Sequence, residues 1–268
     1  MKVDRPVKLS IVTVCRNDLA NLKHTMESLE QQSQELCWEH VLIDGASDDG
    51  TQEWYVSAGF TFPHRSISER DGGIYDAMNK SLDTVAGDYV IFMNAGDRFA
   101  DEDVVGRFVQ RLSTNPSWGY SRARIVDVNG RRLRPEMGTI PYSRRKLLFA
   151  REMICHQAVV MRVDLLRDLG GFDLRMGNAA DFHAEVKAAL REPPVTWADV
   201  DVDFLAGGVS DIEVYRGLWD RHRSRVDALA MSSTKALLDS AWTSLQVKYV
   251  QIRKRLKPLF GDLYLKLR

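Results

Sequence analysis

The sequence predicts an α/β fold in which helices cover both faces of a mostly parallel sheet. Short runs rich in β-branched residues alternate with segments of helical periodicity, and short loops connect them, a pattern typical of parallel sheets. The expected strands are Leu9–Val14, Glu39–Ile43, Thr61–Ser68 and Tyr89–Met93. Polar residues follow these strands, so we expect a binding site at the carboxyl ends of the sheet.

Helical signals fill the intervals between the strands. Asp18 can cap a helix whose apolar residues recur on one face. Further helices are expected over Gln52–Ala58 and Ile74–Val85, the second of them opened by Gly72-Gly73. A crossover helix is the usual connection between parallel strands.

Beyond Asp97 the alternation is less regular. We expect a helix at Asp101–Leu112, a hairpin around Asn129-Gly130, a strand at Val159–Arg162 and a helix at Asp181–Leu190. Mostly helical segments follow. The simplest division is therefore one domain, residues 1–210, and a helical extension, residues 211–268, that is basic and amphipathic.

Composition bounds the partners and the compartment. The 268 residues include 37 Lys plus Arg and 37 Asp plus Glu, so the formal net charge is zero, whereas nucleic-acid binders usually carry a basic excess. The three cysteines are widely spaced and form no CxxC pair, which fits a reducing compartment. We find no signal-like segment and no run of about 20 apolar residues. We therefore expect no nucleic-acid partner and a cytoplasmic protein that could still lie on the inner face of the cell membrane.

Acidic residues end several of the expected strands. Each of Asp44, Glu69, Asp71 and Asp97 could serve a turn or a helix cap, which aspartate favours. Four carboxylates on one edge would repel one another unless a cation compensates, and a hard divalent cation such as Mg or Mn prefers oxygen ligands. No GxGxxG follows the first strand and no GxxxxGK[ST] occurs, so two common phosphate-binding fingerprints are absent.

Several segments between Lys8 and Ser210 form a recognisable set. They are Leu9–Val14, Ile43–Thr51, Asp71–Lys80, Phe92–Asp97, His156–Ala158, Gly170–Asp173, Ala180–Phe182 and Gly207–Ser210. Together they resemble the family 2 glycosyltransferases, in particular the bacterial branch that builds polysaccharides and lipid-linked glycans. That resemblance implies the GT-A (Rossmann-like) fold, and the second and third segments are long enough to be specific.

The resemblance also implies a donor, an acceptor and a metal. The enzyme would be an inverting transferase that moves a sugar from a UDP, GDP or dTDP sugar to a hydroxyl of a glycan or lipid-linked acceptor. Asp97 would ligate the divalent cation as the last acid of a DxD-type motif. Asn94 and Gly96 depart from that motif, so the diphosphate would carry much of the metal binding. The implied donor-binding residues are Thr13, Arg16, Asp44 (at the nucleotide base), Asp71, Asn79, Lys80 and Asn94.

Asp181 is the catalytic base that the resemblance implies, although Ala180 replaces the acid that often precedes it. A carboxylate on the acceptor side can remove the proton of the attacking hydroxyl. The alternative is that Asp181 caps the helix that it begins. His156 is a possible further active-site residue, and the alternative is a packed histidine.

The extension carries an apolar stripe surrounded by basic residues. Its members recur every three or four residues, as on one face of a helix: Trp242, Leu245, Tyr249, Ile252, Leu256, Leu259 and Leu263. One interpretation is packing against the domain or a second subunit, as in a homodimer. The other is binding to an anionic membrane surface.

Two other functions stay open from the sequence. A nucleotidyltransferase also uses an α/β sheet and a metal, but it usually has a Gly-rich loop after the first strand, which Val14–Asn17 is not. A non-catalytic nucleotide-sugar-binding protein of the same fold would be expected to have lost Asp97 and Asp181, and both are present.

Overall fold

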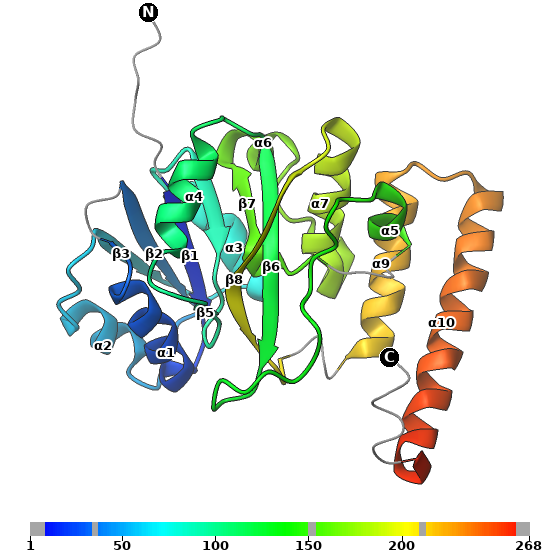
Figure 1. The fold of residues 1–268 in the computed structure, drawn as a ribbon, viewed down its shortest axis with the longest axis horizontal. Helices are drawn as coiled ribbons and strands as arrows, with labels where there is room; N and C mark the ends of the chain where they lie inside the picture. Colours follow the sequence, from blue (N-terminus) through cyan, green and yellow to red (C-terminus); the bar gives the residue numbers. More distant parts are fainter. Residues whose placement is uncertain (1–8, 34–36, 150–153, 209–212, 261–268) are drawn as a thin grey trace, which may run out of the picture.

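The computed structural model describes residues 9–33, 37–149, 154–208 and 213–260. Its centre is an eight-stranded sheet in the order β3-β2-β1-β4-β7-β6-β8-β5. Figure 1 shows the sheet flanked by helices, with α9 and α10 standing beyond it toward the right of the view. The predicted mostly parallel α/β sheet with a helical C-terminal part is confirmed.

The N-terminal half supplies the parallel part of the sheet. Its strands are β1 (Leu9–Cys15), β2 (Trp38–Asp44), β3 (His64–Ser68) and β4 (Tyr89–Phe92), joined through α1 (Leu19–Glu30), α2 (Thr51–Ser57) and α3 (Ile74–Ser81). Every residue of β1 is buried, because helices cover both faces of this central strand. Val12 and Val14 pack into the core that includes α3, whereas Leu9 and Ile11 pack into the core that includes α1.

The second half extends the sheet with mixed strand directions. Its elements are β5 (Arg98–Phe99), α4 (Val104–Leu112), β6 (Trp118–Val126), α5 (Arg144–Leu148), η1 (His156–Ala158), β7 (Val159–Arg162), α6 (Val163–Asp168), η2 (Leu174–Ala179), α7 (Ala180–Arg191) and β8 (Val195–Leu205). Strand β7 is antiparallel to both β4 and β6, and β8 is parallel to β6. The carboxyl ends of β1, β2, β4, β6 and β8 therefore lie at one edge.

Two local predictions need correction. Asp18 occupies the N-cap position of α1 but makes no side-chain capping bond. The Leu19 N–H, one of the unpaired N–H groups of the first turn, donates instead to the Asp49 carboxylate at 2.9 Å, from a loop 30 residues away. The hairpin expected near Gly130 is reduced to isolated bridges, since β6 pairs mainly with β7 and β8.

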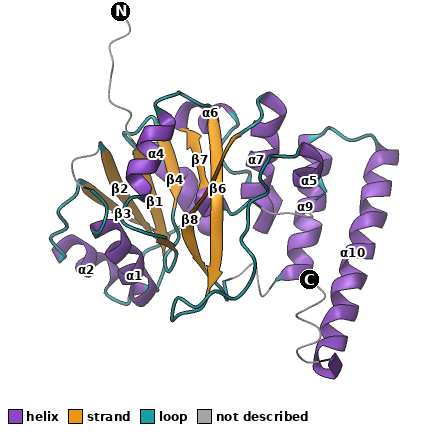
Figure 2. Cartoon of the chain, in the orientation of Figure 1, coloured by secondary structure: helices purple, strands orange, loops and turns teal. Residues whose placement is uncertain are grey.

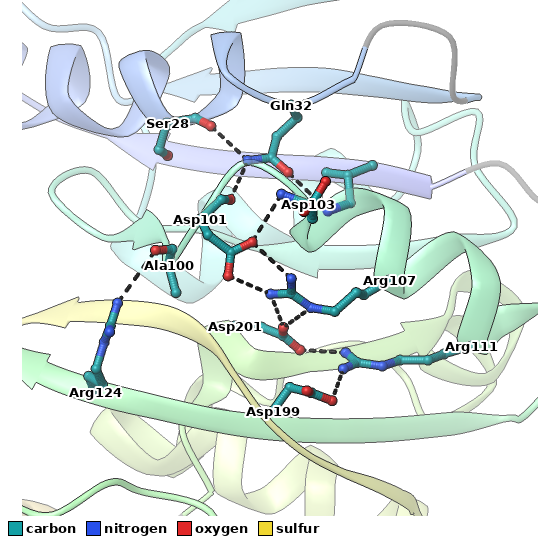
Figure 3. A network of polar contacts seen from close by, with 11 residues as sticks. Ser28, Gln32, Ala100, Asp101, Asp103, Arg107, Arg111, Arg124, Asp199 and Asp201 are labelled. Atoms are coloured by element: carbon teal, nitrogen blue, oxygen red, sulfur yellow. Dashed lines mark hydrogen bonds and ion pairs between the residues drawn. The ribbon is translucent and has the colours of Figure 1, made fainter.

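An ion-pair network centred on the buried Asp201 connects α4 to β8 (Figure 3). Asp201 of β8 is fully buried and lies 2.7 Å from Arg107 and 2.5 Å from Arg111, both on α4. Arg111 also contacts Asp199 at 2.5 Å, and Arg107 contacts Asp101 at 2.8 Å. Two guanidinium partners satisfy the buried Asp201 carboxylate, so the network holds α4 in place without leaving an uncompensated charge.

The C-terminal part consists of α9 (Val214–Ala228) and α10 (Ser233–Phe260), which lie side by side in Figure 2. Helix α9 packs on η2 and α7, and α10 packs on α9. The contact between them is polar near the turn that joins them, where Asp239 accepts from Arg225 and shares a hydrogen bond with His222. Among the described helices, none is sufficiently long and apolar to cross a membrane. The predicted boundary after residue 210 lies outside the described residues.

Candidate active site

The carboxyl edge of the parallel strands brings Arg16 and Asp71 together across Gly45. A Cβ atom at Gly45 would lie 2.5 Å from Asp71 Oδ2 and 3.1 Å from Arg16 Cβ, so a residue with a side chain would have to displace one of them. Asp71 Oδ1 accepts a hydrogen bond from the Gly73 N–H at 2.8 Å. Arg16 is exposed and Asp71 is half-buried, so both side chains can face a ligand at this edge.

Lys80, at the end of α3, is held at the same edge by acidic neighbours. Its Nζ lies 2.9 Å from Glu69 Oε1 and 3.7 Å from Asp76 Oδ2, and it donates to the Arg70 carbonyl at 2.6 Å. The hydrogen bond to Glu69 raises the pKa of Lys80 above its ordinary value, so the ammonium is fully charged at neutral pH. Lys80 therefore adds a positive charge beside Asp71.

Two other residues that are predicted to bind the nucleotide-sugar donor have buried side chains. The Thr13 hydroxyl shares a hydrogen bond with His40 Nε2 at 2.9 Å. Asp44 is fully buried, and its carboxylate accepts from the Ser47 N–H at 3.1 Å and from the Ser47 and Ser68 hydroxyls, both at 2.5 Å. In this structure both side chains are engaged in hydrogen bonds within the protein. A direct contact with the nucleotide-sugar donor would require them to break these bonds.

Asn79 joins α3 to the segment that precedes α7. Its Nδ2 donates to the Phe172 carbonyl at 2.8 Å, and the Phe172 N–H donates back to Asn79 Oδ1 at 2.8 Å. Gly171 has φ +68°, and a Cβ there would lie 2.5 Å from Asn79 Oδ1. The side chain of Asn79 therefore connects α3 to the segment around Phe172 through two hydrogen bonds.

Asp97 is buried and lies between β4 and β5, directly before Arg98. Its side chain is 4% exposed, Oδ2 accepts from Gln157 Nε2 at 2.7 Å, and Oδ1 accepts from the Leu205 N–H at 2.8 Å. Burial raises the pKa of Asp97 to about 7, and the hydrogen bonds from Leu205 and Gln157 oppose that rise. Asp97 therefore joins the loop between β4 and β5 to η1 and to the end of β8.

The neighbours of Asp97 explain the departure from an acidic DxD-type motif. Gly96 has φ +97°, and a Cβ at this position would lie 2.8 Å from Leu205 Cδ2. An aspartate at Gly96 would therefore be strained by this backbone conformation and would have to displace the end of the Leu205 side chain. Asn94 Oδ1 is buried and has no hydrogen-bond partner within the described part of the chain, which is unusual for a buried polar atom.

The oxygen atoms of Asp97 and Asn94 fit a hard cation, but they are few. Each Asp97 oxygen retains a second lone pair, and Asn94 Oδ1 is an oxygen ligand of the kind that such cations accept. However, the four carboxylates do not require a cation to offset their mutual repulsion. Asp44 and Asp97 are satisfied by their own donors, Glu69 pairs with Lys80, and Asp71 accepts from a backbone N–H.

Asp181 lies in the first turn of α7 and lines the same cavity as Phe172. The N-cap residue of this helix is Ala179, so the alternative of Asp181 as the N-cap is wrong. Asp181 Oδ1 accepts from the Phe182 N–H at 2.7 Å. The side chain is half-buried, so its carboxylate can still reach a ligand.

His156 and Asp181 line the same small cavity, of about 10 Å³. The His156 ring stacks on Phe92 with centroids 5.5 Å apart, and its Nε2 is buried without a hydrogen-bond partner among the described residues. Burial lowers the pKa of His156, although the Asp181 charge acts in the opposite sense. The ring is therefore neutral at physiological pH.

Two groups that the sequence prediction omitted also face Asp181. Glu185, one turn further along α7, lines the same cavity and is buried. Burial and the Asp181 charge raise the pKa of Glu185 well above its ordinary value, and Arg221 opposes that rise. Tyr75, in the first turn of α3, has its pKa raised by burial and by the same Asp181 charge.

A second acidic cluster lies outside this site. Ligand atoms of Asp173, His183 and Asp227 lie within 4.8 Å of one another. Arg175 already occupies the cluster, with Nη2 2.5 Å from Asp173 and 3.8 Å from Asp227, and His183 Nε2 lies 2.9 Å from Asp227. The guanidinium supplies the positive charge, so this cluster calls for no metal.

Solved structures define the class of protein that this fold represents. Staphylococcus aureus TarS 1–349 in complex with UDP-GlcNAc is similar with a TM-score of 0.64 at 17% identity, over 95% of this chain and 76% of that chain. The mannosyltransferase PcManGT of Pyrobaculum calidifontis, in complex with GDP-Man and Mn²⁺, has a TM-score of 0.64 at 16% identity, over 98% and 79%. The chain has the GT-A fold of these glycosyltransferases.

Sequence comparison then identifies the family. The family model "Glycosyl transferase family 2" matches residues 10–170. An uncharacterized glycosyltransferase of Mycobacterium tuberculosis (strain H37Rv) is 36% identical over 205 residues, 75% of this chain and 76% of that protein. A PGL/p-HBAD biosynthesis glycosyltransferase of Mycobacterium bovis (strain BCG) is 30% identical over 191 residues, 70% and 72%. The chain belongs to glycosyltransferase family 2 and is a glycosyltransferase.

Proposed function

We propose that this enzyme transfers a sugar from a UDP, GDP or dTDP sugar to a hydroxyl of a glycan or lipid-linked acceptor, with inversion at the anomeric carbon. The observation that carries the proposal is the position of Asp181, half-buried in the cavity that it lines with His156 and Phe172, while Phe172 is hydrogen-bonded to Asn79 of α3. In one displacement, the acceptor oxygen attacks the anomeric carbon while the bond to the diphosphate breaks. Asp181 takes the hydroxyl proton as the attack proceeds.

The donor would lie along the edge formed by Arg16, Asp71 and Lys80. The two cations would face the diphosphate, and Asp71 would face the ribose. Asp44 would recognise the base through the turn that it organises with Ser47. Support comes from the neighbours solved with UDP-GlcNAc and with GDP-Man.

A divalent cation would be held by Asp97 and Asn94 together with the diphosphate. When bound, such a cation neutralises charge that develops on the leaving diphosphate. Two solved neighbours contain Mn²⁺, which supports this assignment. For the acceptor, support comes from the family resemblance and from the relative named for PGL/p-HBAD biosynthesis.

The proposal is tested by incubating the purified enzyme with UDP, GDP and dTDP sugars, each with Mn²⁺. One donor class should release its nucleotide slowly without acceptor and rapidly with a matching glycan or lipid-linked acceptor. NMR of the product should show the anomeric configuration opposite to that of the donor. A product that keeps the donor's configuration would contradict the single displacement.

Replacing Gly45 by Ala should weaken nucleotide binding about tenfold or more, which corresponds to about 1.4 kcal/mol. The added Cβ would lie 2.5 Å from Asp71 Oδ2, so Asp71 or Arg16 must move. Calorimetric titration with the nucleotide measures the change. Gly217→Ala is the matched control, because a Cβ there meets no atom within 4 Å. Equal affinity in the two variants would remove Gly45 and Asp71 from the proposed donor site.

Helix α10 presents an apolar face that does not contact α9. Leu245 is 59% exposed, Tyr249 59% and Ile252 56%, so these members of the predicted stripe do not pack on the domain. Lys254 and Arg255 nearby are also exposed. We propose that this face binds an anionic membrane surface, because apolar residues flanked by cations are complementary to it.

The double variant Leu245→Glu, Ile252→Glu should lose binding to phosphatidylglycerol vesicles and keep its melting temperature. Wild-type binding should weaken as salt is added, because screening reduces the attraction to the anionic surface. Co-sedimentation measures both effects, and Val128→Glu, at a site 80% exposed in the loop after β6, is the control. A wild-type dimer that the double variant converts to a monomer would favour a second subunit instead.

A further inference from the structure

A second cavity, of about 360 Å³, lies beside β6 and the loop that runs from its end to α5 (Figure 1). Three cations line it: Arg122 of β6, Arg132 of the loop and Lys146 of α5. The lining contains one carboxylate, that of Glu136, and its other members are uncharged loop residues. The wall of this cavity therefore carries more positive than negative charge.

The backbone of the loop is fastened to β6. The Met137 N–H donates to the Ala123 carbonyl at 2.9 Å, and the Ala123 N–H donates to the Met137 carbonyl at 3.1 Å. Gly138 has φ +105°, and a Cβ at this position would lie 3.0 Å from the Ser121 carbonyl oxygen. The loop thus lies directly against the strand, and the wall of the cavity is a fixed part of the fold.

Glu136 is shared between two of the cations. Its Oε2 lies 3.5 Å from Arg122 Nη1 and its Oε1 lies 3.4 Å from Arg132 Nη1. One carboxylate cannot neutralise two guanidinium groups. The surrounding segment, residues 122–146, adds to the excess, because it contains eight Lys and Arg residues and two acids in a chain of zero net charge. An anion in the cavity would therefore be attracted.

The cavity lies away from the proposed donor edge. In the sheet order β3-β2-β1-β4-β7-β6, Arg16 follows β1 and Asp71 follows β3, whereas the cavity is beside β6. His156, which shares a cavity with Asp181, immediately precedes β7 and so lies between them in this order. Helix α5 packs on α7, and Ile140 packs on the core cluster that α7 completes. The loop therefore lies on the face of the sheet that carries the proposed base.

We propose that Arg122, Arg132 and Lys146 bind a phosphate group of the acceptor. The proposal rests on the proposed transfer to a glycan or lipid-linked hydroxyl, and it narrows the acceptor to one that bears phosphate. A guanidinium presents paired N–H donors that match phosphate oxygens, and the lysine ammonium adds a point charge. The phosphate can belong to a lipid carrier or to a soluble glycan, because both present the same anion to the cavity.

The test uses inorganic pyrophosphate, titrated calorimetrically into the whole enzyme in about 0.15 M salt. The enzyme is first saturated with the nucleotide diphosphate that it binds, so that the donor edge is filled. Arg122→Gln and Arg132→Gln should each weaken pyrophosphate binding at least about tenfold, since each removes a charged donor. Arg145→Gln removes the same charge from an exposed position of α5 that does not line the cavity, and it should bind as the wild type does. Thermal melting checks the fold, and Arg132, which is 54% exposed, can be replaced without burying a new group.

The outcomes separate this site from the proposed function. A wild-type enzyme that transfers sugar to an uncharged acceptor but binds no pyrophosphate would overturn the phosphate site and leave the transferase function intact. Equal losses in all three variants would assign the binding to the basic surface as a whole. A matching loss of nucleotide affinity would place the donor diphosphate in the cavity. Either result would contradict the proposal.

Two further probes distinguish the sources of the phosphate. Polyprenyl phosphate in detergent represents a lipid carrier, and glucose 1-phosphate represents a soluble glycan phosphate. Tighter binding of polyprenyl phosphate that Arg132→Gln removes would support a lipid-linked acceptor. Equal binding of both probes, again lost in Arg132→Gln, would support recognition of the phosphate alone. Binding of either probe that Arg132→Gln leaves unchanged would count against the cavity.

Discussion

Asp181→Asn should bind the donor and melt as the wild type does, yet transfer at least about a hundredfold more slowly. Asparagine keeps the size of the side chain and can still accept the Phe182 N–H bond, but it cannot take a proton. Because Ala179 holds the N-cap position, the substitution should cost little helix stability. The loss of rate would therefore report the missing base.

The measurement is single-turnover transfer with saturating donor, paired with calorimetric donor affinity and a thermal melt. Asp168→Asn is a matched control, since this acid is 73% exposed at the end of α6. Near-normal turnover of folded Asp181→Asn would exclude Asp181 as the base. The family assignment would stand in that case, because it rests on the sequence comparisons.

Asp97→Ala should abolish transfer and also lower the melting temperature by several degrees. The carboxylate accepts hydrogen bonds from the Gln157 amide and the Leu205 N–H, so its loss should affect the fold as well as the proposed cation site. Removing it leaves two buried donors unpaired, at a cost of about 1–3 kcal/mol each. A melt of the variant measures this structural part of the effect.

The cation is tested separately from the fold. Wild-type transfer should disappear in excess EDTA and return with Mn²⁺, because the cation would offset charge on the leaving diphosphate. Asp97→Asn keeps one acceptor oxygen, so it should melt closer to the wild type than Asp97→Ala and still respond poorly to Mn²⁺. Full wild-type activity in EDTA would show that the reaction needs no divalent cation.

The sequence predicted the strands, and it predicted that most of the acidic residues lie just beyond the strand ends, because both depend on local patterns. Strand β7 lies where the run Val159–Arg162 placed it, and β1 and β2 differ from prediction by a residue or two. Arg16 and Asp71, which follow the two strands on either side of β2, come together across Gly45 at the carboxyl ends of these parallel strands. Glu185 was missed although it is four residues from Asp181 on the same helix, a spacing that places both on one face.

By itself, the sequence determined the α/β class and the family, and it predicted the edge of the sheet where we propose the site. Periodicity, turn residues and contiguous motifs are local, so they can be recognised in the sequence without knowledge of distant contacts. Tertiary structure alone decided that Asp44 and Asp97 are buried and already hydrogen-bonded, and that Asp181, Glu185 and His156 line one cavity. Burial and charge pairing depend on groups far apart in the chain, and only packing brings them within the few ångströms over which they act.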